Sequence, residues 1–137
     1  MKSFIIKTGF FIPLLLMMGT GCEKESLETY STKKIIGKWE IIELGNWPYM
    51  RPLPRRSGYY TEYLPDSIVR VFEYDKNQFT LQAKYWINDS LLYTIYTRDD
   101  GHRVTTKNKY QFYDKYRKLR IDFEFAEYNT EIYKRIN

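Results

Sequence analysis

Hydrophobic and polar residues alternate with a period of two from Ile35 to the end of the chain. The clearest example is the segment 119–125, LRIDFEF, in which every odd position is apolar and every even position is charged. This pattern predicts a β-strand with one buried face and one face in water. The same period predicts further strands at residues 38–44, 59–63, 67–74, 79–87, 91–96, 107–113 and 132–136.

Short turn signals separate these segments and indicate the fold class. They occur at residues 75–77, 88–89, 99–101, 114–115 and 128–129. Strands that recur about every ten to twelve residues are typical of an antiparallel meander. A long sheet with one apolar face is most simply closed on itself, since closure also removes its edges. We therefore predict an all-β, up-and-down antiparallel barrel of about eight strands, with at most one short helical turn near residues 31–36.

The alternation also predicts which side chains face the interior of the barrel. This set consists of Trp39, Phe79, Leu81, Tyr85, Tyr93, Ile95, Leu119, Ile121, Phe123 and Phe125. In small barrels such side chains either fill the interior or leave room for one small ligand. In the second case they would line a pocket by apolar contact, with tyrosine hydroxyl groups that orient the ligand.

The first 21 residues have the pattern of an export signal. Lys2 and Lys7 give the first residues a positive charge, and an apolar run of nine residues covers positions 10–18. As a helix this run would span about 14 Å, roughly half of a bilayer core, so it predicts a cleaved signal peptide and not a transmembrane helix. Residues 22–33 are mostly polar and predict a flexible linker before a domain at residues 34–137.

The only cysteine of the chain, Cys22, stands directly behind this signal. The stretch MMGTGC at residues 17–22 resembles the lipobox of bacterial lipoproteins. In that family the cysteine thiol receives a diacylglycerol group, and the amino group freed by cleavage is usually acylated too, with chains such as palmitate. The resemblance implies that acylated Cys22 has the lipid bilayer as its partner, held by several chains because one alone is marginal. The alternative is an ordinary secreted protein with one unpaired thiol.

The residues after Cys22 bear on the location of the protein. Glu23, Lys24 and Glu25 resemble the acidic surface-export signal of lipoproteins in the Bacteroidota. The resemblance implies an outer-membrane lipoprotein of the cell envelope that is exposed at the surface. A solvated tether explains the same residues equally well and leaves the periplasmic leaflet open.

The start of the predicted domain, IIGKWEII at residues 35–42, resembles the opening of lipocalins. That family places a short helical turn before a Gly-x-Trp motif, here Gly37 and Trp39, and stacks an arginine of the last strand on the tryptophan. Arg135 is the candidate for this arginine, and such a cation–π contact contributes about 0.5–2 kcal/mol. The whole chain is similar to small lipocalin-like lipoproteins of the Bacteroidota. The alternative is that Trp39 is ordinary core and Arg135 is solvated.

A long loop between residues 45 and 58 contains three prolines and is therefore a poor central strand. In lipocalins the connection after the first strand is a lid over the open mouth. The resemblance implies that Trp47, Tyr49 and Arg51 belong to a lid that contacts a ligand or partner. The alternative is a surface loop in which Trp47 plugs the end of the barrel.

Composition and charge restrict the chemistry that the chain can perform. Its 137 residues carry a formal charge of +5 and include one Cys and one His. A single Cys excludes an intrachain disulfide, and His102 lacks the companions that a metal site or a general base needs. Because no phosphate-binding loop or nucleophile motif occurs, we expect no enzymatic activity, no cofactor and no metal. The basic segment 98–120 is expected to be a solvated hairpin, since an export signal argues against nucleic acid as a partner.

Two functional hypotheses follow from these features. The first is a membrane-anchored, non-enzymatic, lipocalin-like lipoprotein that binds a small apolar or amphipathic ligand in its barrel. The second is a filled barrel that acts as a protein-interaction or inhibitor module at the cell envelope, because aromatic and arginine residues suit an interface as well as a pocket. Sugar binding through exposed Trp and Tyr side chains is a weaker third hypothesis. The free volume inside the barrel separates the first two.

Overall fold

One short helix and nine strands form the part of the chain that the computed structural model describes, residues 27–124 and 126–137. Helix α1 (Leu27–Ile35) precedes the strands. The strands are β1 (Gly37–Asn46), β2 (Tyr49–Pro52), β3 (Tyr59–Tyr63), β4 (Ile68–Glu73), β5 (Gln78–Ile87), β6 (Leu91–Thr97), β7 (Arg103–Tyr113), β8 (Lys118–Asp122) and β9 (Thr130–Ile136).

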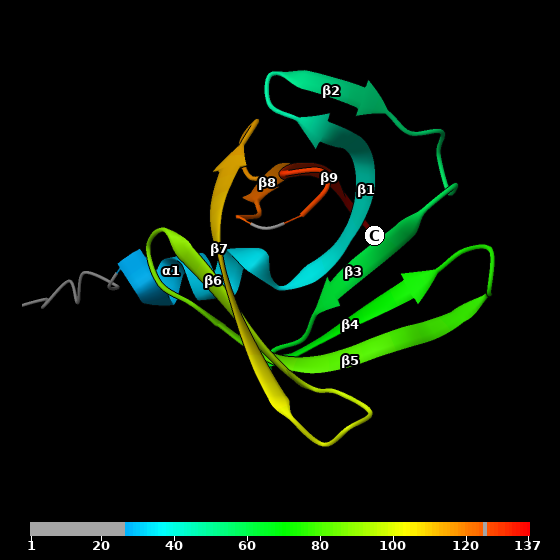
Figure 1. The fold of residues 1–137 in the computed structure, drawn as a ribbon. Coiled ribbons are helices and arrows are strands. Elements are labelled where there is room, and N and C mark those ends of the chain that lie inside the picture. The colour runs from blue at the N-terminus through cyan, green and yellow to red at the C-terminus, as the bar shows by residue number, and fades with distance from the viewer. Residues whose placement is uncertain (1–26, 125) are drawn as a thin grey trace, which may run out of the picture.

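Eight of these strands close into a barrel (Figure 1). Hydrogen-bonded neighbours follow the order β1, β3, β4, β5, β6, β7, β8 and β9, and β9 pairs again with β1. All of these pairings are antiparallel. The prediction of an all-β, up-and-down barrel of about eight strands is confirmed.

Strand β1 pairs with a different partner along each half of its length. Its first half, from Gly37 to Glu40, pairs with β3. Its second half, from Glu43 to Asn46, pairs instead with β2, the extra strand at the edge of the sheet. A register irregularity against β9 separates the halves, between Ile41 and Glu43. Because a bulge bends a strand, β1 curves away from β3 beyond the fourth residue pair.

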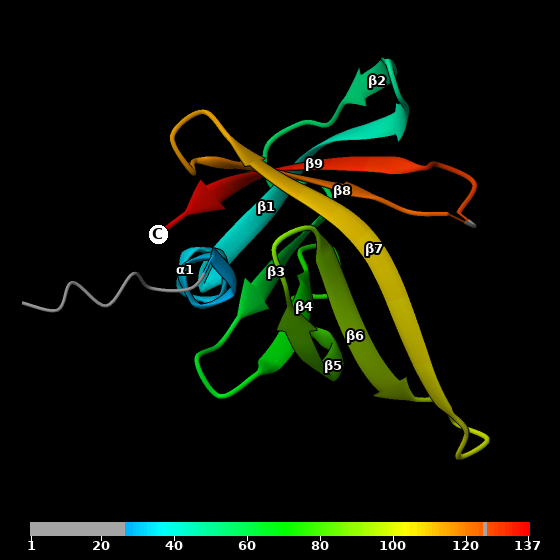
Figure 2. The same ribbon diagram turned by 90° about the vertical axis from the view of Figure 1, so that its left-hand side faces the viewer.

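Helix α1 is longer than the single turn predicted near residues 31–36, and it occupies positions that the sequence assigns to the linker. A helix of nine residues is marginal in isolation, so docking must hold it. Its last residue, Ile35, is completely buried in the core, and Lys33 and Lys34 lie in the last turn, where cations interact favourably with the helix dipole. Figure 2 shows α1 beside the start of β1. Across the described ranges, no helix has the length and apolar character to cross a bilayer.

The barrel is closed at the end where β1 begins. Trp39 is fully buried there, and its indole nitrogen donates a hydrogen bond to the carbonyl of Ile35 at 2.7 Å. The guanidinium carbon of Arg135, on β9, lies 4.2 Å from the centroid of the Trp39 ring. Arg135 also donates hydrogen bonds to the carbonyls of Ile36, at 2.8 Å, and Lys34. The structure thus brings together the Trp39 and Arg135 pair that the lipocalin resemblance implies, and ties both side chains to the end of α1.

Gly37 is required by this arrangement for two separate reasons. Its φ of +132° is a backbone conformation that residues with a side chain rarely adopt. A Cβ atom at this position would also lie 2.8 Å from Nη1 of Arg135. The Gly-x-Trp motif therefore combines a backbone conformation that favours glycine with close approach of the arginine.

Candidate ligand-binding cavity

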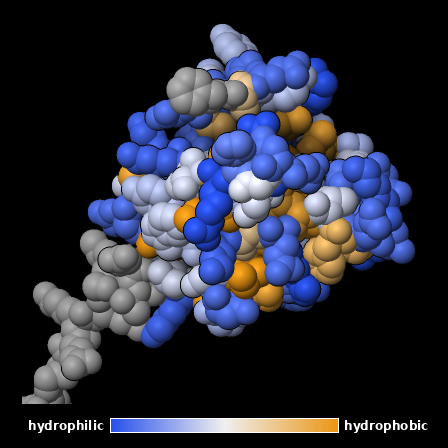
Figure 3. Space-filling model, turned by 60° about the horizontal axis from the view of Figure 1, so that its bottom comes forward, coloured by the Kyte–Doolittle hydropathy of each residue, from blue (hydrophilic) through white to orange (hydrophobic). Residues whose placement is uncertain are grey.

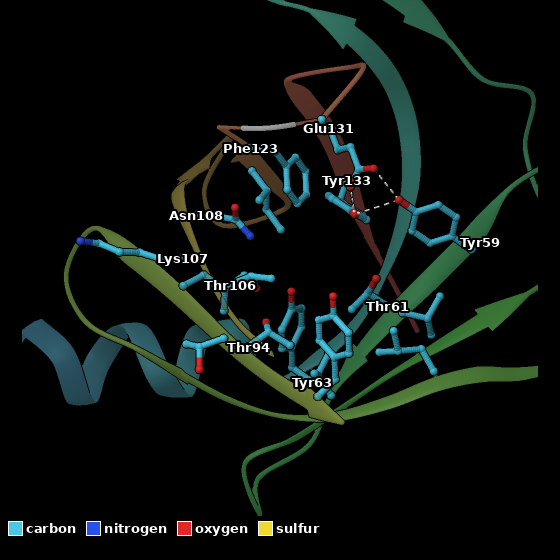
Figure 4. Close-up of a pocket in the computed structure, with 18 of the residues that line it drawn as sticks. Tyr59, Thr61, Tyr63, Thr94, Thr106, Lys107, Asn108, Phe123, Glu131 and Tyr133 are labelled. Atoms are coloured by element: carbon cyan, nitrogen blue, oxygen red, sulfur yellow. Dashed lines mark hydrogen bonds between the residues drawn. The ribbon is translucent and has the colours of Figure 1, made fainter. Parts of the chain in front are cut away.

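The half of the barrel away from Trp39 contains a cavity of about 830 Å³ that is open to solvent (Figure 4). This volume falls within the range of about 300–1,000 Å³ typical of sites for drug-sized ligands. Seven apolar side chains contribute to its walls, namely Val69, Val71, Leu81, Leu92, Ile121, Phe123 and Ala126. Tyrosine, threonine, asparagine and glutamate residues and Lys107 supply the polar part.

Strand alternation places these side chains in the cavity. On β3 every second residue, Tyr59, Thr61 and Tyr63, belongs to the lining. On β6 the same holds for Leu92, Thr94 and Tyr96. Residues directly opposite each other in a ladder share a face of the sheet, so Thr106 and Asn108 of β7, which pair with Thr94 and Leu92, also face inward.

A cluster of Glu131, Tyr59 and Tyr133 forms the most polar corner of the cavity. The hydroxyl of Tyr59 donates to Oε1 of Glu131 at 2.7 Å, and the hydroxyl of Tyr133 donates to Oε2 of the same carboxylate. The two hydroxyl oxygens lie 3.3 Å apart. Figure 4 shows the three groups converging from β3 and β9. No ion pair joins Glu131 to a basic side chain within residues 27–124 and 126–137.

Tyr59, Tyr63 and Tyr133 of the cavity remain protonated at neutral pH. Burial, followed by the charge of Glu131, raises the pKa of Tyr59 and of Tyr63 above the ordinary value of a phenol. Burial and the neighbouring Tyr59 and Glu131 raise the pKa of Tyr133 well above that value. Each phenol therefore acts as a hydrogen-bond donor and not as a base.

Apart from Trp39, the predicted interior residues fall into four groups. Leu81, Ile121 and Phe123 line the cavity. Tyr85 and Leu119 are buried in the core but are not part of the cavity lining. Phe125 lies outside the described residues. The predictions for Phe79, Tyr93 and Ile95 are wrong, because these side chains lie on the outer face of the sheet.

A β-bulge explains the position of Phe79. Val71 pairs with Leu81 whereas Phe72 pairs with Phe79, so Thr80 is an additional residue on β5. One extra residue moves all preceding side chains to the opposite face. Phe79 consequently packs on the outside, 5.2 Å from the Phe72 ring centroid and 42% exposed. Figure 3 shows apolar groups between hydrophilic side chains on this outer surface.

Strand β6 was misassigned because both of its faces are apolar. Leu91, Tyr93 and Ile95 alternate with Leu92, Thr94 and Tyr96, so hydrophobicity alone does not choose a face. Pairing across the ladder decides it, since Tyr93 lies opposite Trp86 and stacks on it with ring centroids 5.0 Å apart. Trp86 is 43% exposed, which places this stack on the outside.

The predicted lid does not cover the cavity. Trp47, Tyr49 and Arg51 belong to the β1–β2 hairpin, and none of them is in the cavity lining. The ring of Trp47 is 53% exposed and lies under the guanidinium of Arg120, at 4.1 Å, so it does not plug the barrel end either. The hairpin is therefore neither a lid over the cavity nor a plug of the barrel end, because pairing with the second half of β1 carries it outward. Its contact with a partner stays a prediction.

The sequence did not single out Glu131, Tyr59 or Tyr133. Glu131 lies one residue before the predicted strand 132–136, so the sequence analysis did not place it on the same face as Tyr133. His102 is exposed in the turn before β7, with Nδ1 3.2 Å from Oδ1 of Asp100. The described residues contain no group of three or more His, Cys, Asp or Glu side chains arranged to hold a metal ion.

Comparison with known proteins gives no assignment: no protein-family model and no curated protein sequence matches this chain.

Proposed function

We propose that this barrel is a binding module for a small apolar or amphipathic ligand, of the lipocalin-like kind. The observation that carries the proposal is the cavity of about 830 Å³, with apolar walls and one converging polar cluster. A pocket of this composition is the usual form of a small-molecule site. The same volume argues against a filled barrel as the working form of the protein.

Binding without catalysis is the activity we propose for this cavity. The raised pKa of Tyr59 and Tyr133 keeps both phenols protonated, so neither removes a proton from a ligand at neutral pH. Both hydroxyls are already engaged with Glu131. Such groups orient a ligand by hydrogen bonding.

Cavity filling tests the binding function. The full-length chain in phosphatidylcholine nanodiscs would be titrated with decanol by calorimetry, with empty nanodiscs as the blank. Thr106→Trp places a large side chain in the cavity, whereas Lys109→Trp places the same side chain on the outer face of β7. We expect saturable binding that weakens at least tenfold in the first variant and is unchanged in the second. Equal binding by both variants, or no saturable binding, would contradict the proposal.

The anchor is a second part of the proposal and concerns Cys22, which lies outside the described residues. The lipobox resemblance supports acylation of Cys22 and attachment to the outer membrane of the cell envelope. Cys22→Ser should move the protein from the detergent phase to the aqueous phase in a phase-partition assay. Unchanged partitioning would show that another feature holds the protein at the membrane.

The β1–β2 hairpin favours a protein interaction as a second candidate function. Tyr49 is 84% exposed and stands beside the half-exposed Trp47, which is unusual for large aromatic side chains and typical of interfaces. A photo-crosslinking residue at position 49 should capture an envelope protein in cells. The same residue at position 76, in the turn after β4, is the control and should capture none.

A further inference from the structure

We propose that the cavity selects amphiphiles whose polar end is a primary ammonium group, held by the cluster of Glu131, Tyr59 and Tyr133. The proposal rests on the proposed binding function and specifies its ligand class. It follows from the hydrogen-bond inventory of the cluster, from the charges around the cavity, and from the apolar walls next to it.

The cluster accepts hydrogen bonds but has no free proton to donate. The hydroxyl protons of Tyr59 and Tyr133 are both directed at the Glu131 carboxylate. A carboxylate has about four acceptor positions, so two remain open, and each phenol oxygen keeps lone pairs. The complementary ligand group must therefore be a donor. An ammonium group offers three N–H donors and no acceptor, and its bonds to a carboxylate are charge-assisted.

The charges that face the cavity also favour a cationic ligand group. Its lining includes the carboxylates of Glu73, Glu124 and Glu131 and one basic residue, Lys107. Glu73 is paired with Lys76, at 2.9 Å, and Figure 4 shows the ammonium of Lys107 directed away from the cavity. Glu131 has no such counter-ion among the described residues. The cavity is therefore acidic although the chain as a whole carries a net positive charge. An acidic cavity disfavours a fatty-acid carboxylate, which would meet a like charge.

Apolar and aromatic surfaces adjoin the cluster and suit the rest of such a ligand. Ile121 pairs directly with Glu131 across the β8–β9 ladder, and Phe123, directly after β8, also lines the cavity. The rings of Tyr59 and Tyr133 meet edge to face with centroids 6.3 Å apart, and both rings present their hydroxyl groups to the carboxylate. Val71, Leu81 and Leu92 then offer contacts for an alkyl tail.

The experiment compares three ligands with the same ten-carbon tail. Decylammonium, decanol and decanoate would each be titrated by calorimetry at pH 7 into the full-length chain in phosphatidylcholine nanodiscs, with empty nanodiscs subtracted. We expect decylammonium to bind at least tenfold more tightly than decanol, and decanoate to bind more weakly than decanol. This series needs no variant, so it does not depend on how a substitution folds.

A matched pair of variants then assigns the preference to Glu131. Glu131→Gln removes the carboxylate from the cavity, whereas Glu62→Gln removes one charge from the outer face of β3, where Glu62 pairs with Arg70. We expect the tenfold preference for decylammonium over decanol to disappear in Glu131→Gln and to persist in Glu62→Gln.

The outcomes separate this inference from the function on which it rests. If decanol binds saturably but decylammonium binds no more tightly than decanol, the ammonium preference is overturned while the binding function stands. The same holds if decanoate binds most tightly. A preference that survives Glu131→Gln also overturns it. If none of the three ligands binds saturably to the wild-type chain, the proposed function itself fails.

Discussion

The two ends of the barrel are built by the same strands and are filled in opposite ways. At the closed end Trp39, Ile35 and Leu119 are completely buried, and Arg135 fastens the end of α1 to the last strand. At the open end the corresponding inner positions carry Thr94, Thr106 and Glu131 around a cavity. The comparison teaches that the closed half supplies stability and the open half supplies the site. Substitutions in the two halves should therefore change different measurements.

The largest effect is expected at Trp39. Trp39→Ala removes a completely buried indole and leaves a cavity in the closed end, which should lower the free energy of unfolding by about 3–5 kcal/mol. Trp86→Ala is the control, since Trp86 is exposed and stacks on Tyr93 outside the barrel. It should cost about 1 kcal/mol. Urea denaturation measures both, and equal losses would break the comparison between the buried end and the outer face.

Arg135→Ala should have the next largest effect. The substitution removes the stack on Trp39 and leaves the carbonyls of Lys34 and Ile36 without their donor. We expect a loss of about 2–3 kcal/mol and a lower melting temperature. Arg117→Ala, which removes an exposed arginine paired with Asp114, should change stability by less than about 0.5 kcal/mol. A melting temperature unaffected by Arg135→Ala would show that the stack does not close the barrel.

A comparison of Gly37 with Gly101 tests the contact with Arg135 separately from backbone strain. Both glycines have positive φ, but only Gly37 lies against Arg135. An alanine at either position is strained, at a cost of about 1–2 kcal/mol. Gly37→Ala must in addition displace the guanidinium, whereas a Cβ at Gly101 meets nothing within 4 Å. We expect Gly37→Ala to be more destabilising in thermal unfolding by about 1 kcal/mol. Equal costs would assign the role of Gly37 to its backbone alone.

The contribution of the open end to stability should depend on pH, and we expect this effect to be smaller than those of the substitutions above. Because burial raises the pKa of Tyr59 and Tyr133 in the folded state, the folded protein retains these protons at alkaline pH where the unfolded chain releases them. The contribution of these two phenols to stability is then constant below about pH 10, the pKa of an unfolded tyrosine, and is lost as the pH rises above that value. At pH 11 the loss should be about 1 kcal/mol per phenol, measured as the urea midpoint.

Single tyrosine variants identify the phenols responsible for this loss. Tyr133→Phe should reduce the alkaline loss of stability, whereas Tyr49→Phe, at an exposed position, should leave it unchanged. A midpoint that does not move between pH 9 and pH 11 would contradict the burial of the cluster.

How well the sequence predicts this molecule depends on how unambiguous each strand is. On β8 the charges at Arg120 and Asp122 leave a single apolar face, so Leu119 and Ile121 were placed correctly. On β6 both faces are apolar, and on β5 the bulge at Thr80 inverts the faces, so Tyr93, Ile95 and Phe79 were placed wrongly. The contact between Trp39 and Arg135 was predicted from the Gly-x-Trp motif and from the arginine stack that the lipocalin resemblance implies.

The polar cluster was not predictable in the same way. Tyr59 is separated from Glu131 by 72 residues, and only closure of the barrel brings them to hydrogen-bonding distance. Nothing in the local pattern distinguishes Glu131 from the solvated acidic residues of other strands. A contact of this kind depends on register across the whole sheet, which a single sequence does not specify.

The change of partner along β1 has a consequence for how fast its backbone amide hydrogens exchange with solvent. Both halves of the strand pair with β9 on one side. On the other side the first half pairs with the barrel strand β3, whereas the second half pairs with the four-residue β2, whose side chains are largely exposed. Short, exposed pairings open locally at lower free energy than core pairings. Deuterium uptake should therefore rise within this one strand, from the Trp39 half to the Gly45 half, so that a single element carries both a rigid and a yielding segment.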